Sequence, residues 1–392
     1  MVKKKFKGKV YKGNKSNGYN AWTFYYSANK NLAKKPPKDK KKIWSLVFFL
    51  INIAVISVIL IVQLRKEGGI ASLNKLWEFE MQKKFILIAV LCFLLSNIAS
   101  SLKLSIYHKK LQKKFRFAFC LKTQFMSKYY TKITPFGVGG QPYEVYYLKK
   151  NKVKTTNALT MVSSSYVSNK LIYALLALIM IITFRWNSLL MQQKSNVKVI
   201  IVLAIISFAI LSIFLTFIIL MCVNKRLGNK IIVLLVKLLA KLRLTKNPGL
   251  LYLKIMRPAL VFQSKMKNFF ASKGLTLVFL ILSLCEYVIE YSVPFFIYSA
   301  FNGFDTAIYW QLLSISVIIE LACRLIPLPG GSGLAELSFY AIFASLFDSG
   351  VLFWALILWR LITYYSYLFV GLFIMICDYI FKPKRKKDKL KK

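Results

Sequence analysis

The chain has 392 residues, of which 57% are hydrophobic, and its 58 lysines and arginines against 13 acids give a formal net charge of +45. Several apolar runs reach about 20 residues, the length that crosses the hydrocarbon core of a bilayer, which excludes a soluble globular protein. The basic residues cluster beside these runs, where positive charge marks the cytoplasmic side and meets anionic lipid. No nucleic-acid motif accompanies the lysines, which argues against DNA or RNA as a partner.

The apolar runs predict six full crossings of the membrane. Residues 1–42 hold 14 lysines against Asp39 alone, and residues 381–392 are also basic, so we expect two cytoplasmic tails, the first of them uncleaved and disordered. With both ends on one side, the number of crossings is even. The predicted spans are 43–62, 85–107, 155–183, 199–223, 275–301 and 351–379.

Two further segments, 117–147 and 307–347, are apolar enough to enter the membrane, and this topology requires each to begin and end on one side. The first opens at the cytoplasm and the second outside. Each has a break at its middle, "TPFGVGGQP" in one and "IPLPGGSG" in the other. The residues of the predicted breaks are Pro135, Gly137, Gly139, Gly140, Pro327, Pro329, Gly330, Gly331 and Gly333.

Irregular backbone inside a membrane leaves unpaired polar groups, so it persists only where protein or a water-filled cavity covers it. Broken helices at matching positions of two halves are typical of the central site of a transporter. We therefore predict an all-α, polytopic helical bundle with two opposed re-entrant helix pairs, arranged like inverted repeats. The alternative is that both breaks are kinks in ordinary packed helices.

Residues 224–274 hold 12 basic residues and no acid. The stretch 231–244 makes a helix of roughly 21 Å, too short to span. The next apolar stretch is interrupted by Arg257 and Pro258. We expect both to be amphipathic helices at the cytoplasmic interface.

Ionisable residues inside the apolar segments are the candidate functional residues, because a charge at membrane depth needs a partner or a cavity. Glu286 and Glu290 lie one helical turn apart, as do Glu320 and Arg324. Two interpretations stay open: a structural charge network, in which Arg360 and Lys170 neutralise the acids, or a binding site. The candidate cavity residues are Glu144, Gln141, Glu286, Glu290, Glu320, Arg324, Glu336 and Arg360.

These residue types suit a phospholipid headgroup, because bases hold a phosphate and acids hold an amine. The sequence shows no nucleophile–base pair, no metal-ligand cluster and no phosphate-binding GK[ST] loop. We therefore expect no catalytic residues, no metal and no cofactor.

The stretches "TPFGVGGQPYEVYYLKKNKV", "IPLPGGSGLAELSFYAIF" and "WRLITYY", in this order, resemble the lysylphosphatidylglycerol synthase transmembrane family. That flippase-like domain also forms the N-terminal half of the bacterial multiple peptide resistance factors. The resemblance covers most of residues 43–380 and implies one flippase-like transmembrane domain there. It places Arg360 on the family's arginine in the last helix. The chain departs from the family at Gln141, where an acid is common, and at Glu144, where an arginine is common.

The resemblance implies an integral membrane lipid translocase that moves an aminoacylated or related phospholipid, such as lysyl-phosphatidylglycerol, between the leaflets of a bacterial inner membrane. In this family a separate cytosolic domain, which we expect to be absent here, makes the lipid from charged tRNA. The alternatives are a phosphatidylglycerol lysyltransferase or another lipid-modifying transferase, with a partner subunit supplying the chemistry, and a non-transporting membrane scaffold. The expected partners are phospholipid and membrane, with a second copy of the chain or a separate synthase as further possibilities.

Overall fold

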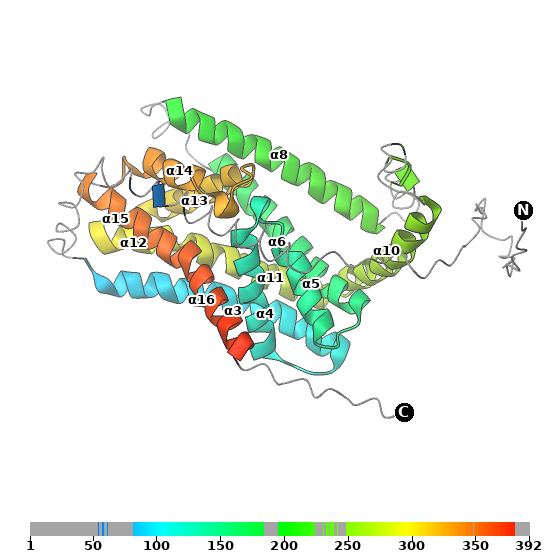
Figure 1. Ribbon diagram of the computed structural model, residues 1–392. Helices are drawn as coiled ribbons and strands as arrows, with labels where there is room; N and C mark the ends of the chain where they lie inside the picture. Colours follow the sequence, from blue (N-terminus) through cyan, green and yellow to red (C-terminus); the bar gives the residue numbers. More distant parts are fainter. Residues whose placement is uncertain are drawn as a thin grey trace, which may run out of the picture.

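The computed structural model describes residues 81–183, 195–223, 248–347 and 349–380, together with isolated positions within 54–61 and 230–241. All regular elements in these ranges are helices, and Figure 1 shows them packed into one bundle. The predicted tails at 1–42 and 381–392 lie outside the described residues, as does most of the predicted span 43–62. The elements are α3 (Lys83–Gln112), α4 (Phe117–Ile133), η1 (Pro135–Gly137), α5 (Gly140–Lys150), α6 (Thr155–Thr183), α8 (Ser195–Val223), α10 (Pro248–Ala271), α11 (Lys273–Tyr291), α12 (Val293–Asn302), η2 (Thr306–Ile308), α13 (Tyr309–Cys323), η3 (Pro329–Gly331), α14 (Leu334–Phe343), α15 (Ser349–Arg360), the π-helical turn η4 (Leu361–Tyr365) and α16 (Ser366–Ile380).

Six described helices are long and apolar enough to cross a membrane, so the prediction of an all-α polytopic bundle is confirmed. Five of them correspond to predicted spans. The sixth, Thr306–Cys323, belongs to the segment that the sequence assigned to a re-entrant pair. The six are Lys83–Gln112, Thr155–Ile182, Val197–Leu220, Lys273–Asn302, Thr306–Cys323 and Val351–Asp378.

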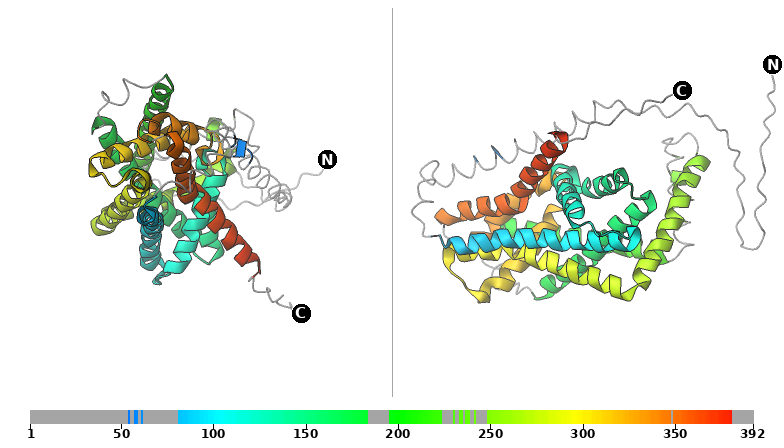
Figure 2. Two further views of the ribbon diagram at one scale, coloured as in Figure 1. Left: turned by 90° about the vertical axis from the view of Figure 1, so that its left-hand side faces the viewer. Right: turned by 90° about the horizontal axis from the view of Figure 1, so that it is seen from below.

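The long helix α3 runs antiparallel to α11 and α12 (Figure 2, right). Contacts at its two ends therefore show which other elements lie at each end of the bundle. The amide of Gln82, before α3, donates to the carbonyl of Ala300 near the end of α12, at 2.9 Å. At the other end, the ammonium of Lys110 donates to the hydroxyl of Ser272, just before α11, at 3.0 Å. The chain therefore enters α4 from one end of the bundle and α13 from the other.

The segment α4–η1–α5, here called the first hairpin, turns back on itself at its break. Leu148 near the end of α5 packs in one cluster with Cys120 near the start of α4 and with Leu104 of α3. The two arms approach closely at Gly140, where a Cβ atom would lie 2.1 Å from Oγ1 of Thr131. Only glycine permits this approach, which explains one residue of the first break.

The segment α13–η3–α14, here called the second hairpin, also turns back. The ring of Phe347, which follows α14, contacts the rings of Tyr298 and Phe301 of α12, at the end of the bundle where α13 begins. At its break Gly330 has φ +62° and lies against the ring of Tyr364, where a Cβ atom would come within 2.0 Å. Both the backbone and the packing therefore require glycine there.

The two breaks share one backbone geometry and contact each other. In each, a proline opens a 3₁₀ turn whose second residue is left-handed: Phe136 at φ +54°, ψ 9° and Gly330 at φ +62°, ψ 14°. A left-handed aromatic residue is strained, so the geometry of the first break is imposed by its surroundings rather than by local preference. Two hairpins that start at opposite ends of the bundle thus meet at their tips.

The helix α10 corrects one sequence expectation. It runs unbroken from Pro248 to Ala271, so Arg257 and Pro258 do not interrupt it. Its buried residues Met266 and Phe269 pack against α6 and α11, and this packing supports a helix that the proline would weaken in isolation. The placement of α10 at a membrane interface stays a prediction.

Candidate functional site

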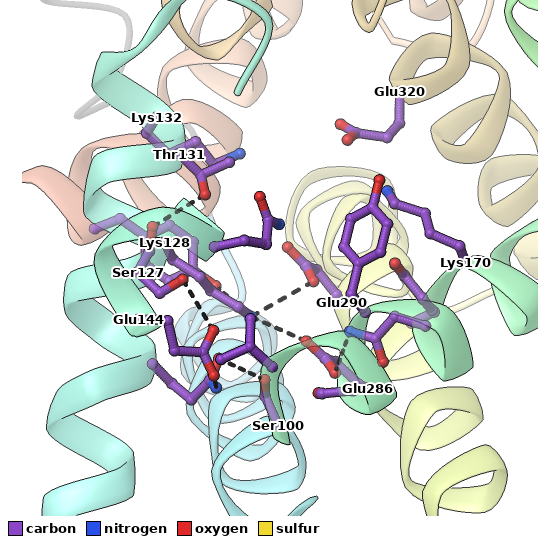
Figure 3. Close-up of a pocket in the computed structure, with 18 of the residues that line it drawn as sticks. Ser100, Ser127, Lys128, Thr131, Lys132, Glu144, Lys170, Glu286, Glu290 and Glu320 are labelled. Atoms are coloured by element: carbon purple, nitrogen blue, oxygen red, sulfur yellow. Dashed lines mark hydrogen bonds and ion pairs between the residues drawn. The ribbon is translucent and has the colours of Figure 1, made fainter. Parts of the chain in front are cut away.

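A polar cavity of about 190 Å³ lies between the two hairpins and the helices α3, α6, α11 and α16. Figure 3 shows the side chains of α4 and α5 on one side, those of α11 in the middle, and Lys170 and Glu320 on the far side. The lining residues are Ser100, Gln124, Ser127, Lys128, Thr131, Lys132, Gln141, Glu144, Val162, Ser165, Tyr166, Asn169, Lys170, Glu286, Tyr287, Glu290, Tyr291, Glu320, Arg324 and Tyr367.

Behind the cavity wall, Lys103 of α3 is fully buried. Its ammonium donates to a carboxylate oxygen of Glu286 at 2.6 Å, to the hydroxyl of Ser283 at 3.0 Å and to the side-chain oxygen of Asn169. All three donor positions of the ammonium are therefore used. Because a charge buried in an apolar setting persists only with such partners, this cluster joins α3, α6 and α11.

The two glutamates of α11 meet a lysine from the first hairpin. The ammonium of Lys128 lies 3.4 Å from one oxygen of Glu286 and 4.0 Å from one oxygen of Glu290. It also donates to the hydroxyl of Tyr367 at 3.2 Å. Glu286 is thus held between two lysines, while Glu290, with 26% of its side chain exposed, is held loosely and faces the cavity.

Glu144 joins the two arms of the first hairpin through neutral groups. Its carboxylate accepts a hydrogen bond from the amide nitrogen of Gln124 at 2.9 Å and a longer one from the hydroxyl of Ser127 at 3.4 Å. The side-chain oxygen of Gln124 in turn accepts from the hydroxyl of Ser100 on α3 at 3.1 Å. No ion pair involves Glu144 in the part of the chain that the structure describes.

Two lysines line the cavity without a carboxylate partner at ion-pair distance among the described residues: Lys132 at the end of α4 and Lys170 on α6. The ammonium of Lys170 lies over the rings of Tyr166 and Tyr173, at 5.4 and 5.6 Å from their centroids. That of Lys132 lies 5.9 Å from the ring of Tyr364. Aromatic faces stabilise a cation but leave its hydrogen-bond donors free for an anion.

The second hairpin contributes two ion pairs. In the first pair, Arg324 lies 3.1 Å from Glu320, and both line the cavity. In the second, Arg360 lies 2.8 Å from Glu336, whose other oxygen accepts from the amide of Gly333 at 2.6 Å. Arg360 lines a smaller cavity of about 50 Å³ that shares Lys132, Glu290 and Glu320 with the larger one.

The structure brings six of the eight candidate residues to one cavity: Gln141, Glu144, Glu286, Glu290, Glu320 and Arg324. Glu336 lines neither cavity, and Arg360 lines only the smaller one. The suggestion that Arg360 and Lys170 neutralise Glu286 and Glu290 was wrong. Their partners are Lys103 and Lys128, whereas Arg360 pairs with Glu336 and the ammonium of Lys170 lies over the rings of Tyr166 and Tyr173.

Sequence reasoning missed three cations, Lys103, Lys128 and Lys132. A signal for each was present, because each stands inside a segment expected to enter the membrane, where an ionisable residue needs a function or a partner. Counted together, the described charges around the two cavities are six cations (Lys103, Lys128, Lys132, Lys170, Arg324 and Arg360) and five acids (Glu144, Glu286, Glu290, Glu320 and Glu336), a formal excess of one positive charge.

Within the described ranges no three His, Cys, Asp or Glu side chains come together as metal ligands.

Neither a curated protein nor a solved structure gives a significant match to the chain. The family described as "Lysylphosphatidylglycerol synthase TM region" matches residues 49–371, which include both hairpins and all the charged residues of the cavity. The chain therefore belongs to the lysylphosphatidylglycerol synthase transmembrane family, a membrane domain tied to the synthesis or flipping of that lipid.

Proposed function

We propose that the protein is a lipid translocase that moves an anionic or aminoacylated phospholipid, such as lysyl-phosphatidylglycerol, between the two leaflets. The observation that carries the proposal is the polar cavity between two broken hairpins that start at opposite ends of the bundle. A site at the meeting point of such elements is reached from either side when one hairpin shifts against the other, which is the geometry of alternating access.

The charges of the cavity suit a phospholipid headgroup. Among the described residues, Lys132 and Lys170 have no carboxylate partner, so their donors are available to the oxygens of a phosphodiester, and Arg324 adds a guanidinium to the same cavity. Glu290 and Glu320 have partly exposed carboxylates, which suit the amino group of an aminoacylated headgroup. In this proposal the site holds both ends of such a headgroup, and the family membership supports a lipid as its ligand.

The test is the movement of fluorescent phosphatidylglycerol in proteoliposomes, followed by quenching of the label in the outer leaflet. We expect Lys132→Ala and Lys170→Ala each to slow movement by about tenfold or more, because a hydrogen bond to a charged group contributes about 1.5–3 kcal/mol. The matched control is Lys109→Ala, an exposed lysine of α3 outside the cavity. Equal rates in all four proteins would refute the proposal.

The family description also names a synthase, so a transferase is the second candidate function. Purified protein incubated with lysyl-tRNA and phosphatidylglycerol tests it directly. Formation of labelled lysyl-phosphatidylglycerol would establish the transferase, whereas we expect no product.

For the translocase we further propose a bacterial inner membrane as the location, with both termini in the cytoplasm.

A further inference from the structure

Glu144 differs from Glu286 and Glu336, the other two buried acids around the two cavities, in the partners of its carboxylate. Glu286 has two lysines, and Glu336 has Arg360 and a backbone amide. Glu144 is only 5% exposed, yet its hydrogen-bond donors are the neutral side chains of Gln124 and Ser127. An ionised carboxylate buried without a cation is costly, and protonation removes that cost.

The charged groups that face Glu144 are already engaged elsewhere. Lys103, from α3, is saturated by its own partners, and Lys128, from α4, lies against Glu286 and Glu290. From α11, Glu286 adds a like charge. From α6, which packs on α5, the cavity receives Lys170, whose ammonium lies over tyrosine rings. Figure 3 shows Lys170 across the cavity from Glu144.

Glu144 can nevertheless exchange a proton with water, because its side chain lines the polar cavity. It also sits where a change of charge has a mechanical effect. The chain of hydrogen bonds from Ser100 through Gln124 to Glu144 connects α3, α4 and α5. As a carboxylate, Glu144 only accepts hydrogen bonds, whereas the protonated acid also donates one. Protonation therefore changes the contact between the two arms of the first hairpin.

We propose that Glu144 is a proton-binding site of the cavity and that binding of an anionic headgroup is linked to its protonation. The inference rests on the proposed function for its lipid but not for its proton. With Glu144 ionised the formal excess around the cavities is one positive charge, and one bound proton raises it to two. An anionic headgroup therefore binds better to the protonated protein, and by linkage the headgroup strengthens proton binding.

The first experiment needs no lipid transport. Infrared difference spectra of the full chain in nanodiscs, recorded over a pH series, are expected to show a protonated carboxyl band in the wild type that Glu144→Gln lacks. Asp378→Asn is the matched control, because Asp378 is an exposed acid outside the cavity, and it should keep the band. Gln124→Leu removes one donor to the carboxylate, so the band should persist to higher pH. Identical spectra for wild type and Glu144→Gln, with Gln124→Leu also unchanged, would overturn the proton site.

The second experiment tests the link to lipid. Binding of fluorescent phosphatidylglycerol to the wild type should weaken as pH rises, by at most about tenfold per pH unit, the limit for one titrating group. In Glu144→Gln, which resembles the protonated form, binding should stay strong and lose this dependence. A wild type that binds the lipid with no pH dependence would overturn the linkage and leave the proposed function standing. A carboxyl band that titrates in a protein that moves no lipid would support the proton site and count against the translocase.

Discussion

Replacing Gly330 with alanine tests the packing at the tip of the second hairpin. The left-handed backbone, at φ +62°, costs an alanine about 1–2 kcal/mol. The new Cβ would also lie 2.0 Å from the ring of Tyr364, and an overpacked site of this kind costs about 1–3 kcal/mol. The two terms together predict a free energy of unfolding that is lower by about 2–5 kcal/mol.

Two other glycines separate these terms. Gly303, at φ +86° and ψ 166°, has no neighbouring atom within 4 Å of the point where a Cβ would stand, so Gly303→Ala carries only a backbone cost, about 1–3 kcal/mol in this glycine-specific region. Gly274 lies in α11 with open space around it, so Gly274→Ala should be neutral or stabilising by up to about 1 kcal/mol. Reversible denaturant unfolding in bicelles would measure all three.

The size of the Gly330→Ala effect decides whether the contact exists. If Gly330→Ala costs no more than its backbone strain of about 1–2 kcal/mol, the tip of the second hairpin does not pack on Tyr364, and the described contact is wrong. A second check is the pair of changes Gly330→Ala and Tyr364→Ala. With the ring removed, alanine at position 330 should cost only its backbone strain.

Two further predictions concern the ion pairs. Lys103→Met leaves the buried Glu286 with Lys128, at 3.4 Å, as its one cationic partner among the described residues, so the free energy of unfolding should fall by about 3 kcal/mol or more. Adding Glu286→Gln should recover part of the loss, and no recovery would show that Lys103 acts through packing alone. Lys122→Ala removes an exposed pair with Asp378 and should change the unfolding free energy by less than about 1 kcal/mol, with a smaller effect at high salt; a larger, salt-independent change would contradict this.

The architecture could be predicted from the sequence because the spans and the breaks are local features. Runs of about 20 apolar residues define five of the described spans, and the paired Pro–Gly stretches mark both tips. The same local reasoning assigned Thr306–Cys323 to a re-entrant pair, although its length and hydropathy also satisfy a span. It also broke α10 at Pro258, where long-range packing on α6 maintains the helix.

The pairing of charges could not be predicted, because each pair joins residues far apart in the chain. Lys103 and Glu286 are separated by 183 positions, and a single sequence does not show which lysine contacts which acid. In a chain with 58 lysines and arginines, Lys103, Lys128 and Lys132 are also hard to distinguish from the lysines that mark the cytoplasmic side. The pair of Arg324 and Glu320 differs from these, because the two residues are four positions apart on one helix and this spacing is visible in the sequence.

The ion pairs divide the helices into two groups. Lys103 and Lys128 tie α3, α4 and α11 together, whereas Arg360 ties α15 to the second hairpin. The helix α16 follows α15 in the chain, and among the described residues the exposed contact between Lys122 and Asp378 is the one salt bridge that connects it to the first group. If the second hairpin, α15 and α16 moved together away from α3, α4 and α11, no buried salt bridge among the described residues would break, so the molecule can open along this boundary at little electrostatic cost.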